Sequence, residues 1–185
     1  MKKLISLVVV GLTAVTTYGQ GTFNFSNFSG PVDAPVRQGT TGNPLVGSAT
    51  YMAAVAWAQG VVSDPALLAL LPSATTPFLG SGFPGYFFGP AVSPGATVNG
   101  TVTLQVLYWN QATAANFATA KSVAGGEWAQ SALFQVSIPA SATGLPVDLV
   151  GLTPLTMQIN QIPEPATIAL AGLGAAALLI FRRRK

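Results

Sequence analysis

The side chains that could carry out nucleophilic, acid–base or metal chemistry are few in this 185-residue sequence. It contains no histidine and no cysteine. Their absence excludes Ser-His-Asp and Cys-His catalysis and the common zinc sites. It also excludes disulfide bonds and thiolate chemistry, so the folded part must be stabilised by burial alone.

Carboxylates are the remaining candidates for catalysis, and four lie between the two apolar ends of the chain: Asp33, Asp64, Glu127 and Asp148. Glycoside hydrolysis requires two carboxylates across a cleft. Each of the four, however, lies within two residues of a proline or glycine, where a turn or helix-cap role accounts for it, as for Asp64 directly before Pro65. We therefore expect no catalytic residue and no cofactor. No loop has the closely spaced oxygen ligands of a calcium site, although a site assembled from distant loops stays open.

Aromatic residues offer a second kind of chemistry, because the apolar face of an exposed ring can stack on a sugar. Tyr86 and Phe87 lie between Gly85 and Gly89, and Trp128 follows Gly126 and Glu127. Both segments are predicted as loops, so these three residues are the candidate glycan contacts. The other two tryptophans, Trp57 and Trp109, lie in or beside predicted strands and are expected to pack in the core.

Charge patterning argues against nucleic acid as a partner. The net charge of +3 arises from basic residues at the extreme ends, whereas the part between them carries two cations, Arg37 and Lys121, against the four carboxylates. Its formal charge is therefore −2. Phosphate binding needs lysine and arginine clustered on one face, which this distribution does not provide.

The elements that must position these residues are mainly β-strands. Residues alternate between apolar and polar in 101–108, where Val102, Leu104, Val106 and Tyr108 share one face. Glycine and proline separate such segments. Strands are predicted over 22–28, 49–58, 101–108, 132–138 and 155–159, and short helices over 65–71 and 112–123. This pattern predicts a single antiparallel β-sandwich or jelly-roll domain over residues 20–161.

The N-terminal residues 1–19 are typical of a secretory signal peptide. Lys2 and Lys3 precede an apolar stretch of about a dozen residues, and Thr17 and Gly19 provide small side chains at a cleavage site. We expect cleavage after Gly19, with Gly21 as the second choice.

The C-terminal end combines three features in a fixed order. Pro163, Glu164 and Pro165 precede an uncharged apolar stretch over 166–181, and the last four residues are basic: Arg182, Arg183, Arg184 and Lys185. As a helix, residues 166–181 would span roughly 24 Å, slightly less than the roughly 30 Å of a hydrocarbon layer. The stretch is predicted as a minimal transmembrane helix whose basic tail stays in the cytoplasm as a membrane stop.

This order of motif, apolar helix and basic tail resembles the PEP-CTERM sorting signal of Gram-negative bacteria. The resemblance covers residues 162–185. It implies transient or permanent residence in the inner membrane and processing near Pro163–Pro165 by an exosortase, a membrane-embedded peptidase. Prolines on both sides of Glu164 disfavour helix, which would leave an extended segment for an enzyme to grip. A permanent single-span anchor is the alternative.

The sequence therefore predicts a protein exported through the inner membrane as an anchored precursor, with its mature form at the cell surface or outside the cell. Because the usual catalytic residue types are missing, we expect a non-enzymatic surface or extracellular-matrix protein. A small carbohydrate-binding module for exopolysaccharide is the alternative, and an enzyme ranks third.

Overall fold

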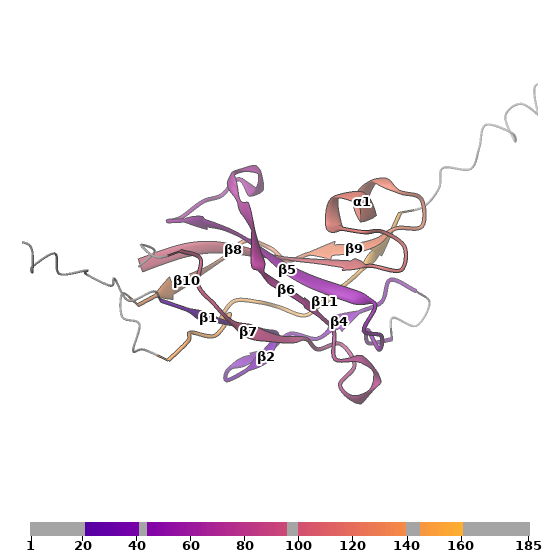
Figure 1. Cartoon of the computed structure of the whole chain (residues 1–185), viewed down its shortest axis with the longest axis horizontal. Coiled ribbons are helices and arrows are strands. Elements are labelled where there is room, and N and C mark those ends of the chain that lie inside the picture. The colour runs from indigo at the N-terminus through magenta and orange to yellow at the C-terminus, as the bar shows by residue number, and fades with distance from the viewer. Residues whose placement is uncertain (1–20, 41–43, 96–99, 140–144, 161–185) are drawn as a thin grey trace, which may run out of the picture.

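Figure 1 shows the chain as a computed structural model, which describes residues 21–40, 44–95, 100–139 and 145–160. The predicted signal peptide (1–19) and the predicted sorting segment with its transmembrane helix (162–185) lie outside the described residues.

The largest element is a six-stranded antiparallel sheet. Its order is β12 (Gln158–Ile159), β9 (Glu127–Gln130), β8 (Gly100–Asn110), β5 (Tyr51–Gln59) and β6 (Ala69–Pro77), and β10 (Phe134–Ile138) pairs with β8 beside β9. Ser131, between β9 and β10, completes the edge of β8: its backbone N–H donates to the Val106 carbonyl (2.9 Å), and its hydroxyl accepts from the Val106 N–H (3.0 Å). The prediction of a mainly β body with antiparallel sheets is confirmed.

Three two-stranded ladders pack on one face of this sheet. β1 (Phe23–Ser26) pairs with β7 (Phe88–Val92), β2 (Phe28–Ser29) with β3 (Val32–Asp33), and β4 (Val36–Arg37) in parallel with β11 (Leu155–Thr156). Figure 1 shows β1, β2 and β7 below the large sheet, and one core cluster joins residues of both layers. Because this second layer consists of separate short ladders, a sandwich of two continuous sheets or a jelly roll stays a prediction.

In the central strand β8, the face that was predicted to be apolar is buried. Val102, Leu104, Val106 and Tyr108 are all fully buried. Its other face is also covered, since the Thr103 hydroxyl donates to the Gly60 carbonyl (2.7 Å) and accepts from the Val62 N–H (3.0 Å). The strand is therefore buried on both faces rather than on one.

Both predicted helices are shorter in the structure. Of the residues 65–71, only Pro65–Leu67 are helical, as the single 3-10 turn η1, which Asp64 caps as expected; residues 69–71 already belong to β6. The second helix, predicted over 112–123, is α1 (Phe117–Ser122) with Asn116 as its cap. The sequence pattern missed β6 because it contains Pro72 and Pro77, which a strand tolerates only at the edge of a sheet, where β6 lies.

Candidate functional site

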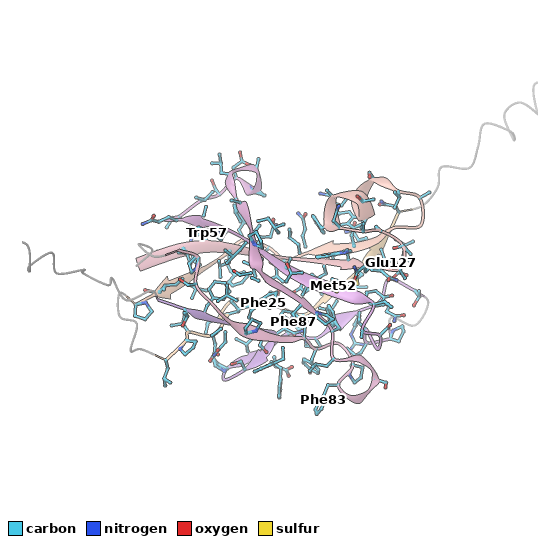
Figure 2. The ribbon with its side chains drawn as sticks, viewed as in Figure 1. Phe25, Met52, Trp57, Phe83, Phe87 and Glu127 are labelled. Atoms are coloured by element: carbon cyan, nitrogen blue, oxygen red, sulfur yellow. The ribbon has the colours of Figure 1, made fainter. Side chains whose placement is uncertain are left out.

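A hollow of about 200 Å³ opens where the connection from β6 to β7 meets β1 and β2. This connection contains the short turn η2 (Gly80–Gly82). We call the hollow the aromatic pocket, and it is lined by Ser26, Phe28, Leu79, Phe83, Tyr86, Phe87 and Phe88. In Figure 2, Phe83 projects outward from this connection, whereas Phe87 points toward Phe25 in the core.

The rim of the aromatic pocket presents rings to solvent. Phe28, Phe83 and Phe88 are 61%, 64% and 66% exposed. The rings of Phe28 and Tyr86 lie with centroids 5.2 Å apart at 58°. The Tyr86 hydroxyl donates to Oδ1 of Asp33 (2.8 Å), and this hydrogen bond raises the pKa of Tyr86. An exposed carboxylate therefore stands beside the aromatic surface.

A buried asparagine fixes the backbone beneath the aromatic pocket. Asn27 is fully buried; its Nδ2 donates to the carbonyls of Ala34 (2.8 Å) and Gly85 (2.9 Å), and its Oδ1 accepts from the Phe87 N–H (2.7 Å). Gly85 has a φ of +87°, which favours glycine. The rim is thus held by contacts between segments about 60 residues apart, and no local sequence signal marked Asn27 for this role.

The structure separates the two candidate residues of the loop between Gly85 and Gly89. Tyr86 lies at the rim of the aromatic pocket, as a glycan contact would. Phe87 is fully buried, with its ring centroid 4.9 Å from Phe25 and 6.0 Å from Tyr108. Phe87 therefore forms the floor of the pocket, and the expectation that its ring is exposed is wrong. Successive side chains of an extended segment point to opposite sides, so its neighbour Phe88 takes the exposed position.

The third candidate, Trp128, does not line the aromatic pocket. The segment predicted as its loop begins strand β9 at Glu127. The Trp128 Nε1 donates to Oδ1 of Asn160 (3.0 Å), and its ring meets Phe117 edge-on at 5.9 Å under Lys121, whose Nζ lies 4.8 Å from the ring centroid. The half-buried Trp128 packs against a second apolar cluster that contains Trp109, which is buried as expected.

The four carboxylates have separate hydrogen-bond partners. Glu127 accepts from the Tyr51 hydroxyl and from Nδ2 of Asn110 (3.0 Å). Burial, and then this bond to Glu127, raise the pKa of Tyr51. The other three carboxylates accept from different donors: Asp33 from Tyr86, Asp64 from the Ala66 N–H, and Asp148 from Asn24 and Ser29. In the hydrogen bonds that the structure shows, no donor is shared between two of the four carboxylates. The described residues also contain no group of three or more acidic, histidine or cysteine side chains able to hold a metal ion.

We expect Asp148 to make the stability of the fold depend on pH in the acid range. Its Oδ1 accepts from the Ser29 hydroxyl and from Nδ2 of Asn24 (2.9 Å), and these two bonds lower its pKa. A lowered folded-state pKa contributes stability above the unfolded value of about 4, and that stability is lost as the pH falls through the folded-state pKa. We expect the melting temperature to decrease once the pH is lower than about 4. The decrease should be smaller in Asp148→Asn.

Thermal melts between pH 2 and 7 test this expectation. Asp64→Asn is the control, because an asparagine also caps a helical turn. Parallel melting curves for the unmodified protein and Asp148→Asn across the range would contradict the assigned role.

Comparison with known proteins identifies the C-terminal segment. The family model of the PEP-CTERM protein-sorting motif matches residues 161–185, which include Pro163–Pro165 and the basic residues 182–185. The chain is therefore a PEP-CTERM sorting domain-containing protein, as its sequence predicted, and the motif indicates secretion and sorting to the cell surface. No curated protein and no solved structure matches the chain. In the part of the chain that the structure describes, no helix is long and apolar enough to cross a membrane.

Proposed function

We propose that this chain is a non-enzymatic cell-surface or extracellular-matrix protein of a Gram-negative bacterium, processed at its PEP-CTERM motif by an exosortase-type enzyme. The match over residues 161–185 carries the proposal. In the precursor, the apolar stretch 166–181 holds the chain in the inner membrane and the basic tail 182–185 stops it there. The structural partners of all four body carboxylates support a body without catalytic activity.

Intact mass spectrometry of the protein isolated from the producing bacterium tests this proposal. The expected mass lacks residues 1–19 and ends near Pro163–Pro165. A product that still carries Arg182–Lys185 would favour a permanent membrane anchor over processing. A full-length product in the cytoplasm would exclude export.

The aromatic pocket favours a second candidate function, the binding of exopolysaccharide. Exposed rings such as Phe28 and Phe83 can stack on the apolar faces of sugars, and the Asp33 carboxylate beside Tyr86 can accept hydrogen bonds from hydroxyls. The pocket volume of about 200 Å³ suits a single sugar ring rather than a long chain segment.

Affinity electrophoresis in gels that contain the producer's exopolysaccharide separates the two candidates. If the pocket binds glycan, Phe83→Ala and Tyr86→Ala each weaken binding about tenfold, the loss expected for a ring contact of about 1.4 kcal/mol. Val61→Ala, at a 72% exposed position outside the pocket, is the control. If only Trp128→Ala loses binding, the glycan site lies at α1 and β9 instead of the aromatic pocket. If the gel does not retard the unmodified protein, glycan binding is excluded and the surface or matrix function is favoured.

A further inference from the structure

The last described residue before the sorting motif, Asn160, uses all its polar groups in hydrogen bonds. Its backbone N–H donates to the Gly126 carbonyl (2.9 Å), and its own carbonyl accepts from the Gly125 N–H (2.8 Å). Its Nδ2 donates to the carbonyls of Ala120 (2.8 Å) and Val123 (3.2 Å) at the end of α1, and its Oδ1 accepts from Trp128. Five bonds therefore tie this residue to α1 and β9.

The chain leading to Asn160 is also fixed. Leu155–Thr156 pairs with β4, the Met157 N–H donates to the Arg37 carbonyl (2.9 Å), and Gln158–Ile159 pairs with β9. A side chain at Gly126 would collide with the Ala120 carbonyl, so this glycine permits the close contact of α1 with the start of β9. The folded body therefore extends to the boundary of the matched segment 161–185.

This boundary leaves a short spacer. Gln161 and Ile162 alone separate Asn160 from Pro163, and three residues span at most about 10 Å. Ala166, where the predicted membrane stretch begins, is six residues from Asn160, at most about 20 Å. A folded domain of about 100 residues has a radius of gyration of about 13 Å and is therefore wider than both distances. An enzyme that binds Pro163–Pro165 at the membrane surface must then contact the body near Asn160.

The surface beside Asn160 is formed by small side chains and one cation. Ala118, Lys121, Ser122 and Ala124 are exposed there, and we call this surface the exit face. Lys121 lies over both Phe117 (5.4 Å) and Trp128 (4.8 Å). It is one of two basic residues between positions 20 and 161. Small residues allow close approach, and the cation complements an acidic surface.

We infer that the exit face is the docking surface for the membrane-embedded processing peptidase, and that Asn160 holds this face next to the cleavage motif. The inference rests on the proposed processing. The occupant is a peptidase with an acidic patch near its active site, because the spacer is short and the exposed cation of the face is Lys121. Asn160 acts as a positioning residue rather than as a contact in the cleavage reaction.

Pulse-chase measurement of precursor processing in the producing bacterium tests the inference on the full chain. Lys121→Glu is expected to slow processing about fivefold, as charge reversal at a steering contact does, whereas Lys121→Arg is not. Ten glycine and serine residues inserted between Asn160 and Gln161 should slow processing similarly, because they lower the effective concentration of the face at the enzyme. With the insertion present, Lys121→Glu should have no further effect.

Val61→Glu is the charge control. Val61 lies two residues after β5, at the end of the sheet opposite the Tyr51–Asn110 pair. Thermal melts of each variant check the fold. Processing of Lys121→Glu or of the insertion variant at the unmodified rate, or faster processing with the insertion, would overturn the inference and leave the proposed function standing. A precursor that is not cleaved even when unmodified overturns the processing itself.

Discussion

Replacing Pro163, Glu164 and Pro165 together by alanine is expected to abolish C-terminal processing, so that the protein accumulates as a precursor ending in Lys185. The two prolines disfavour helix at and before their positions, whereas alanine is the best helix former. Three alanines directly before the apolar residues 166–181 would therefore favour continuation of a helix through the segment that the enzyme must grip. We expect a loss of at least a hundredfold in processing rate, about 2.7 kcal/mol in activation free energy.

Immunoblots of fractionated cells and the mass of the product measure this effect. The double variant Gln161→Ala/Ile162→Ala is the matched control, because it lies in the same segment and leaves the three motif residues intact. Cleavage of the triple variant at the unmodified rate would show that the family match over 161–185 does not direct processing of this chain.

The second large effect concerns the core. Phe87→Ala is expected to lower the free energy of unfolding by about 3–5 kcal/mol. The Phe87 ring is fully buried, and three aromatic rings surround it with centroids 4.9 to 6.0 Å away: Phe25, Phe78 and Tyr108. Removing it takes away contacts to both layers of the fold and leaves a cavity between β1 and β8.

The neighbouring residue supplies the control for chemical denaturation. Phe88 is 66% exposed at the rim of the aromatic pocket, so Phe88→Ala should change the free energy of unfolding by less than about 0.5 kcal/mol. Equal destabilisation by the two variants would contradict the inward orientation of Phe87. If the pocket binds glycan, Phe88→Ala should weaken binding while leaving stability unchanged.

Several strands were predictable because their signal is local. The alternating pattern of 101–108 and 132–138 corresponds to β8 and β10, where Phe134, Val136 and Ile138 are buried and Gln135 and Ser137 are exposed. Of the strands that the pattern missed, β6 contains two prolines, and β7 (Phe88–Val92) contains a glycine and a proline. Their extended form depends on pairing with distant segments, as β7 pairs with β1 about 65 positions earlier in the chain.

The sequence by itself indicated secretion and sorting to the cell surface, because the sorting motif is a run of neighbouring residues whose order carries the information. It also indicated the β class, since strand alternation is a property of consecutive side chains. Only the tertiary structure decided which ring of Tyr86, Phe87 and Phe88 is buried, and which distant groups satisfy Asn27 and Asn160. The hydrogen bonds that join Asn160 to Trp128, Asn27 to Gly85 and Ser26 to Phe87 connect residues 32 to 61 positions apart, and such contacts form only when the chain packs.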